Sequence, residues 1–402
     1  MTGELNQAAL LKERPLGDLS RLSSRALMFG GVGIAASAAG YFMEGTSQFF
    51  QAYLIAYIFW IGLSLGSLAL LMIQYLSGGA WGLVARRIFE AATGTLPLMA
   101  LLFIPIALNM ETLFLWARPE AASDPVLVSK AAYLNVDFFY LRAALYFAIW
   151  IGLATTLNRW SKQQDESAPL PPGPMDRRFR VLSGPGLVLF MLTVTFMSVD
   201  WVMSLDPHFY STIFGVLTVG GQGLATLAFT ILTLQALSNS KPISEVTTAE
   251  RFHDYGKLML AFVMLWAYFN VSQLLIIWSA NLPEEIPWYL ERLQGHWGPM
   301  AWFVLLGHFV LPFVLLLSRD LKRHGKVLSY VALLILFMRV VDLIWTVGPV
   351  FRHEGTAHWL DFATVLAFAG PWLFIFYRNL GSRALVPAND PYFKEAVADG
   401  GH

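Results

Sequence analysis

The sequence predicts an all-α integral membrane protein of about ten transmembrane helices, with both termini in the cytoplasm. Composition is the first reason: 56% of the 402 residues are hydrophobic and only 13% are charged, whereas soluble proteins carry about 25% charged residues. Apolar runs of about 20 residues, long enough to cross a bilayer, recur along the chain. Positive charges gather in alternate connections between these runs, which predicts the orientation.

We predict spans, in chain order, near residues 25–43, 51–76, 83–108, 138–158, 181–203, 210–236, 257–280, 298–318, 327–350 and 358–378. The first is rich in glycine (Gly30, Gly31, Gly33 and Gly40), a composition that favours close packing against another helix. Residues 1–24 are expected to form a cytoplasmic N-terminal segment, and residues 379–402 a cytoplasmic tail. Between them, residues 25–378 form a single membrane domain.

The distribution of lysine and arginine predicts on which side of the membrane the termini lie. Of the 27 lysine and arginine residues, 21 lie on the side of the N-terminal segment, in the connections after the even-numbered spans or at the span ends that border them. Five lie on the opposite side, including Arg142 near the outer end of the fourth span, and Arg339 falls near the middle of a span. Because positive residues concentrate on the cytoplasmic side, this bias predicts cytoplasmic termini. The polar start of the chain also lacks the features of a secretory signal peptide.

Two spans resemble each other at a corresponding depth. Residues 196–201 read FMSVDW and residues 337–342 read FMRVVD, with their aspartates one position out of step. This echo predicts two four-helix bundles, at about 51–203 and 210–350, with the first and last spans peripheral. The match is short, and chance remains an alternative explanation.

The composition also excludes several classes of site. The absence of cysteine excludes disulfides, thiolate metal sites and cysteine-bound iron–sulfur clusters within this chain. Of the eight histidines only His308 lies clearly inside a span, so a haem held by two intramembrane histidines is not expected. The formal net charge of zero gives no indication of a nucleic-acid partner.

Ionisable residues inside the spans are the main functional signal, because hydrocarbon makes them costly. The candidates for proton transfer or a quinone-associated site are Asp200, His308, Arg339 and Asp342, with Glu90, Tyr268, Gln273 and Arg142 as weaker candidates. Carboxylates and a histidine can relay protons because burial and pairing bring their pKa values near neutrality. The same groups can line a quinone headgroup pocket, where they accept the protons released on oxidation.

Each candidate also has a structural interpretation, which the sequence leaves open. Arg339 and Asp342, three residues apart on one helical face, can neutralise each other and act as a clamp. His308 can be a neutral core histidine, and Asp200 can be hydrated at the outer surface. Glu90 lies four residues after Arg86, so a helix-surface ion pair explains it equally well.

Several stretches resemble a known family. They are residues 59–67 (FWIGLSLGS), 78–82 (GGAWG), 253–258 (HDYGKL), 273–285 (QLLIIWSANLPEE) and 308–312 (HFVLP). These stretches and the ten-span plan resemble the NrfD/polysulfide-reductase type of membrane subunit. More closely, they are similar to the smaller, ActF-type membrane subunit of bacterial alternative complex III.

The resemblance implies a subunit of a quinol:electron-acceptor oxidoreductase in the bacterial cytoplasmic membrane. It implies a sister NrfD-like subunit, a multihaem cytochrome c and an iron–sulfur subunit as partners, with a terminal oxidase as a possible further one. The haems and iron–sulfur clusters are then expected on these partners, none on this chain, and menaquinone/menaquinol as the lipid-soluble substrate. Two other classes remain open from the residues alone: a proton-coupled secondary transporter and a purely structural anchor.

Overall fold

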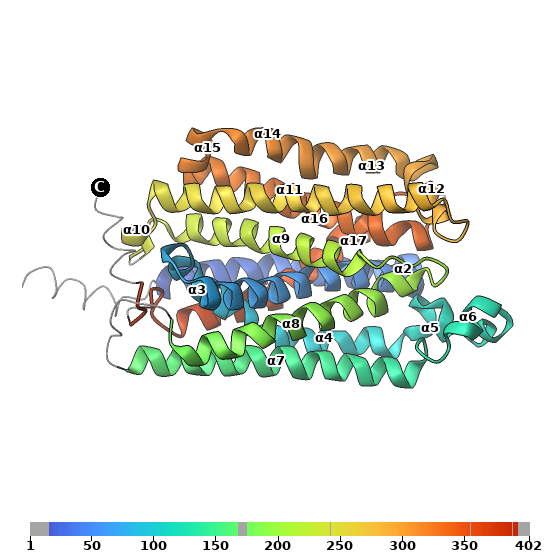
Figure 1. The fold of residues 1–402 in the computed structure, drawn as a ribbon, viewed down its shortest axis with the longest axis horizontal. Coiled ribbons are helices and arrows are strands. Elements are labelled where there is room, and N and C mark those ends of the chain that lie inside the picture. Colours follow the sequence, from blue (N-terminus) through green and yellow to red (C-terminus); the bar gives the residue numbers. More distant parts are fainter. Residues whose placement is uncertain (1–15, 168–174, 242, 354, 388, 393–402) are drawn as a thin grey trace, which may run out of the picture.

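The computed structural model describes residues 16–167, 175–241, 243–353, 355–387 and 389–392, and within these ranges the chain is helical, with no strand (Figure 1). Most of the predicted N-terminal segment 1–24 and the end of the tail 379–402 lie outside the described residues. The described helices are α2 Leu16–Ser77, α3 Ala80–Thr93, α4 Leu96–Leu108, α5 Met110–Leu113, η1 Leu115–Ala117, η2 Pro119–Ser123, α6 Pro125–Lys130, α7 Val136–Glu166, α8 Arg177–Trp201, η3 Met203–Leu205, α9 Phe214–Leu237, α10 Ile243–Val246, α11 Ala249–Ala280, α12 Ile286–Leu293, η4 Gly295–Trp297, α13 Gly298–Val304, η5 Leu305–Val310, α14 Leu311–Leu317, α15 Arg319–Arg323, α16 Gly325–Phe351 and α17 Trp359–Gly381.

The all-α fold is therefore confirmed, and the chain has the pattern of a multi-pass membrane protein. Nine helical segments in the described part are long and apolar enough to cross a membrane: Gly17–Ser77, Trp81–Leu108, Val136–Glu166, Arg177–Leu205, Phe214–Leu237, Ala249–Ala280, Gly295–Leu317, Gly325–Phe351 and Trp359–Gly381. Each of the ten predicted spans overlaps one of these segments. The first two predicted spans share the segment Gly17–Ser77.

Helix α2 is interrupted at Gly45, whose φ of 85° and ψ of 168° are not helical. Contacts with α17 show that the two arms run in opposite directions. A Cβ on Gly30 would lie 2.3 Å from the Cα of Gly370, whereas one on Gly40 would meet Leu360, so the first arm runs antiparallel to α17. In the second arm, the oxygen of Ala52 accepts from Thr364 and Ser64 accepts from Trp372, which is the parallel order.

Three of the four glycines of the first arm pack against α17, as their composition predicted, whereas a Cβ on Gly31 would meet no atom within 4 Å. Gly30 lies against Gly370, and a Cβ on Gly33 would lie 2.3 Å from the backbone nitrogen of Ala367. Such approaches are possible only where neither backbone carries a large side chain, and they bring the two backbones within dispersion contact. Gly30, Gly33 and Gly40 therefore allow α2 to approach α17 closely.

The long helices lie roughly along one axis (Figure 1). Helices α4, α7 and α8 lie on one side in this view, α11, α13, α14 and α16 lie on the other, and α9 packs against α2, α8, α11 and α16 between them. Helices α5, α6 and α12 lie at one end, here called the α6 end. Helices α10 and α15 and the described C-terminal segment lie at the opposite end, here called the α10 end.

At the α6 end, two connections are tied together by polar contacts. His208 Nε2 lies 2.9 Å from Asp124 Oδ2, and Lys130 Nζ donates to the oxygen of Pro207 at 2.6 Å. Asp124 also caps α6 by accepting a hydrogen bond from the nitrogen of Val126. That bond, with a smaller contribution from His208, lowers the pKa of Asp124.

Candidate functional site

Three of the four main predicted residues come together around Trp266, on α11. Arg339 and Asp342 lie on α16, and His308 lies on η5, which packs against both α11 and α16. All three side chains are buried. The fourth residue, Asp200, lies on α8 and belongs to a separate cluster.

The ion pair expected from the spacing of Arg339 and Asp342 is present, with Arg339 Nη1 donating to Asp342 Oδ2. The guanidinium rests on the backbone of α9, because a Cβ on Gly221 would lie 2.5 Å from its Cζ atom. Glycine at this position leaves the space that the guanidinium fills. Asp342 also sits one turn before Thr346, whose hydroxyl donates to its backbone oxygen at 2.8 Å.

Beside the ion pair lies a small cavity of about 50 Å³, here called the Asp342 cavity. This is space for one or two water molecules, since each occupies about 30 Å³. Its walls combine aromatic and polar side chains from α2, α8–η3, α9, α11, α12 and α16, among them Thr218, Trp266, Asn270, Gln273, Trp288, Arg339, Asp342, Trp345 and Thr346. The charged pair therefore faces a space that water or a polar group can occupy.

The ring of His308 stacks face to face on the ring of Trp266, with centroids 4.4 Å apart and planes 3° from parallel. It lies in the π-helical turn Leu305–Val310, four residues before Pro312. Proline has no N–H to donate to the oxygen of residue 308, which favours a local change of helical register. Neither ring nitrogen has a partner among the described residues at hydrogen-bond distance and angle, although the side chain is fully buried and the backbone of Met338 lies nearby.

A larger, mostly apolar cleft of about 440 Å³ adjoins this site and is here called the Trp266 cleft. It runs between α11 on one side and α12, α13 and η5 on the other, and it shares Trp266, Asn270 and Trp345 with the Asp342 cavity. Its rim includes Val271 and Trp302, which are exposed on the outside of the helix bundle. One indole thus borders the open cleft, the polar cavity and the stacked histidine.

Two further polar side chains join the cleft and the cavity. Gln273 Oε1 accepts from Ser211 at 2.9 Å, and its Nε2 lies 3.3 Å from the hydroxyl of Tyr289 in the cleft wall. Burial raises the pKa of Tyr289 to about 12, so this phenol stays neutral at physiological pH. Tyr268, by contrast, points away from the site and is 66% exposed.

Asp200 is fully buried, so the interpretation of a hydrated surface residue is wrong. Arg142 on α7 binds it with two hydrogen bonds, Nε to Oδ2 at 2.8 Å and Nη2 to Oδ1 at 3.0 Å. The hydroxyl of Tyr146 donates to Oδ2 at 2.7 Å. The guanidinium also lies over the ring of Tyr133, at 3.9 Å from its centroid. The guanidinium of Arg142, the carboxylate of Asp200 and the hydroxyl of Tyr146 thus bind one another, as a clamp between α7 and α8 requires.

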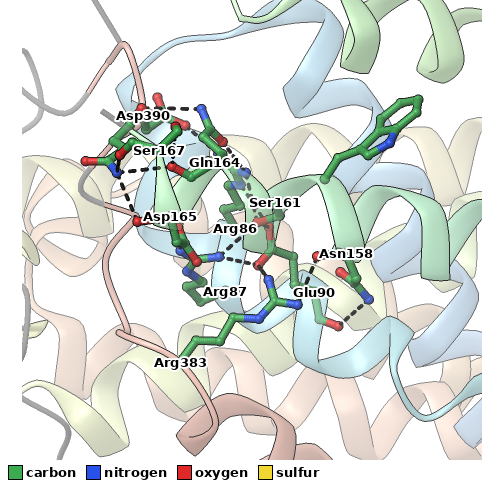
Figure 2. Close-up of polar contacts among 12 residues, drawn as sticks. Arg86, Arg87, Glu90, Asn158, Ser161, Gln164, Asp165, Ser167, Arg383 and Asp390 are labelled. Atoms are coloured by element: carbon green, nitrogen blue, oxygen red, sulfur yellow. Dashed lines mark hydrogen bonds and ion pairs between the residues drawn. The ribbon is translucent and has the colours of Figure 1, made fainter. Parts of the chain in front are cut away.

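Glu90 belongs to a third cluster, at the α10 end (Figure 2). It accepts hydrogen bonds from Arg86, Arg87, Ser161 and Tyr75. Arg86 in turn donates to Asp390 at 2.7 Å, which attaches the C-terminal segment to α3 and α7. The contact of Glu90 with Arg86 that the spacing predicted is present, within a larger network. A polar cavity of about 150 Å³ lies beside Glu90.

Sequence reasoning missed several residues of the site, chiefly the aromatic ones. Trp266 was missed, although helical spacing places it on one face of α11 with Asn270 and the predicted candidate Gln273, a signal that separates these three from Tyr268. The position of Trp288 and Trp345 against the same cavity had no sequence signal, because it depends on how α12 packs on α16. The described residues contain no group of three or more His, Asp or Glu side chains arranged to hold a metal ion.

Comparison with known proteins adds no assignment. No model of a known protein family matches the sequence. A search of curated proteins finds no match either.

Proposed function

We propose that this chain is a membrane subunit of a quinol:electron-acceptor oxidoreductase, in which the Trp266 cleft admits the quinol and the His308–Asp342 region accepts its protons. We further propose ten membrane crossings, with α2 contributing two, and termini in the bacterial cytoplasm. The α6 end then faces the outside. The redox centres belong to the partner subunits expected from the resemblance: a sister NrfD-like subunit, a multihaem cytochrome c and an iron–sulfur subunit.

The observation that carries the proposal is the position of Trp266. It separates an apolar cleft that is open on the outside of the bundle from a buried histidine with two unpartnered ring nitrogens. A quinol has a long apolar tail and a small polar ring, and ligand sites are mainly apolar with a few placed polar groups. In a bilayer, the mouth of the cleft would open to lipid.

In this proposal the chain itself carries out only proton transfer. Oxidation of a quinol gives a quinone, two electrons and two protons, and the electrons leave to a redox centre on a partner. A neutral imidazole has one nitrogen that can accept a proton, so His308 can take the first. Arg339 holds the carboxylate of Asp342 beside the cavity. Protons can pass to this carboxylate through ordered water.

The test is quinol oxidation by the purified complex carrying His308→Phe or Asp342→Asn. Phenylalanine keeps the stacking on Trp266 but removes the ring nitrogens, and asparagine keeps the volume of Asp342 but removes its charge. We expect a loss of about a hundredfold or more in turnover, the range of general acid–base effects. Tyr268→Phe on the outer face of α11 is the matched control and should be neutral. Full turnover of both site variants in an intact complex would refute the proposal.

A structural anchor is the second candidate, favoured by the buried ion pairs of the Arg142–Asp200 and Glu90 clusters, which join neighbouring helices. It predicts a complex that assembles with this chain, carries c-type haem and keeps full turnover in the site variants. A proton-coupled transporter predicts instead a chain that purifies alone and takes up a solute. Haem absorbance of the purified material and a turnover assay distinguish the three.

A further inference from the structure

Arg292, on α12, is a fully buried arginine whose charge has no acidic partner. Its Nη1 donates to the oxygen of Trp288 at 2.8 Å, and its Nη2 donates to the oxygen of Thr346 at 2.7 Å. Its guanidinium lies 3.8 Å from the centroid of the Trp288 ring. Its Nε atom has no hydrogen-bond partner among the described residues, and none of their carboxylates forms a salt bridge with it.

This lack of an acidic partner is unlike the other buried arginines of the site and the clusters. Arg86, Arg142 and Arg339 each pair with at least one carboxylate. A buried cation without a counter-ion is costly, because carbonyl dipoles and an aromatic face replace only part of its hydration. The pKa of Arg292 accordingly falls to about 9 through burial, and it remains a cation at neutral pH.

The surroundings of Arg292 lie between two cavities. Trp288, Trp345 and Thr346, which its side chain and backbone contact, are walls of the Asp342 cavity. Its neighbour Glu291 lines a separate polar cavity of about 380 Å³ at the α6 end, here called the vestibule, together with residues that include Asp206, Val350 and His353. The two cavities share no lining residue.

The wall between the cavities is thin. On α16 it extends from Thr346 to Val350, one turn or about 6 Å. On the opposite side it extends from Val202 to Leu205, across η3. Along α16 the Asp342 cavity and the vestibule are therefore about one helical turn apart, and Arg292, which donates to the oxygen of Thr346, places its charge beside that turn.

We infer that Arg292 is an electrostatic barrier that keeps protons from passing between the vestibule and the Asp342 cavity. A fixed positive charge in a narrow, dry passage raises the free energy of any cation that enters it, as at arginine-lined constrictions in water channels. The inference rests on the proposed protonation role of the Asp342 cavity. It adds that the site is sealed toward the α6 end, so protons taken up there do not escape freely through the vestibule.

The charge and the hydrogen bonds of Arg292 can be separated by two substitutions. Arg292→Gln removes the charge but keeps a hydrogen-bonding side chain, and Arg292→Lys keeps the charge but loses the fork of donors. The full chain, purified with its subunits, is reconstituted into liposomes holding a pH-sensitive dye, and the decay of an imposed pH gradient is followed.

We expect Arg292→Gln to accelerate proton leakage about tenfold, the effect of one charge at about 10 Å in a medium of intermediate dielectric. At mildly acidic pH, the proton leakage of the Arg292→Lys variant should stay close to that of the unsubstituted chain. Arg118→Gln, which removes a charge from the vestibule wall outside the barrier, is the control and should not leak. Proton leakage in the double variant Arg292→Gln with Asp342→Asn should return to the rate of the unsubstituted chain, because Asp342→Asn removes the proton acceptor behind the barrier.

The lysine variant gives a second, independent reading. A lysine has a lower ordinary pKa than arginine, and burial lowers it further, so it loses its proton as the pH rises. The groups whose charges act on this position are Asp206 and Glu291, while Tyr289 stays neutral over this pH range. Arg339 and Asp342 line the cavity on one side, and His353 lines the vestibule on the other. We therefore expect leakage through Arg292→Lys to increase from acidic to alkaline pH, more steeply than in the unsubstituted chain.

Several outcomes would contradict the barrier role of Arg292. Equal leakage in the glutamine and lysine variants at all pH values, or none in either, would show that Arg292 only staples α12 to α16. Leakage that persists after Asp342→Asn is added would show a route that bypasses the cavity. If Arg292→Gln does not fold, the pH dependence of the lysine variant decides. Quinol turnover is measured separately, so failure of the barrier and failure of the proposed function give different results.

Discussion

The Arg142–Asp200 pair should be a clamp that contributes stability but no chemistry. Removing the arginine by Arg142→Met deletes both of its hydrogen bonds to the carboxylate, at 2.8 and 3.0 Å, and leaves Asp200 with Tyr146 as its side-chain donor. Breaking a buried pair by removing one partner costs about 3–5 kcal/mol, because the remaining charge is unpaired. We expect a loss of that size in the free energy of unfolding, measured in detergent micelles.

The double replacement Arg142→Met with Asp200→Leu tests the origin of that loss. Replacing both partners by apolar groups removes the unpaired charge, so we expect most of the stability to return, to within about 1–2 kcal/mol. Turnover per folded molecule should be unchanged in the double variant. Loss of turnover in a stably folded Asp200→Asn chain would contradict this reasoning and would place Asp200 in the functional site.

Three further predictions concern single positions. Gly221→Ala places a methyl 2.5 Å from Arg339 Cζ, so the guanidinium must move by about 1 Å to reach van der Waals distance. We expect quinol turnover to fall about a hundredfold as a result. The control is Gly152→Ala, which has no atom within 4 Å of the new carbon and should have normal turnover. Gly45→Ala forces a side chain to φ 85° and should lower the free energy of unfolding by about 1–2 kcal/mol; an unchanged value would mean that the bend is not required. Asp390→Ala deletes a partner of a fully buried guanidinium, so limited proteolysis should cleave the C-terminal segment sooner than in the unsubstituted chain, and equal cleavage rates would count against its docking.

The overall fold was largely predictable because one physical rule dominates it. A span needs about 20 apolar residues, and that requirement is local, so runs of apolar residues located the long helices. Their ends were less predictable, since α7 continues to Glu166 and α11 begins at Ala249, beyond the predicted spans 138–158 and 257–280. The packing of Gly30 and Gly33 was also predictable, since small residues at helical spacing serve mainly to bring backbones together. The bend at Gly45 had a weaker signal, a single glycine between two apolar runs.

The site was less predictable, because a sequence gives the depth of a residue but not always the face it occupies. Tyr268 and Asn270 lie two residues apart on α11, yet one is exposed and the other lines the Asp342 cavity. Arg142 and Asp200 were both candidates, but their pairing across 58 positions depends on how α7 packs on α8. The unpartnered state of His308 likewise depends on neighbours from other helices.

The two aspartates of the sequence echo show why similar residues at similar depth can differ in role. Asp200 pairs with an arginine from another helix, so the pair holds α7 to α8, and both carboxylate oxygens accept bonds from Arg142. Asp342 pairs with Arg339 of its own helix, so the pair adds little to the attachment between helices. What the second pair has instead is a cavity, a stacked histidine nearby and an adjoining cleft. A buried charge that does not hold the bundle together is costly, and this cost makes Asp342, rather than Asp200, the carboxylate to test first for proton transfer.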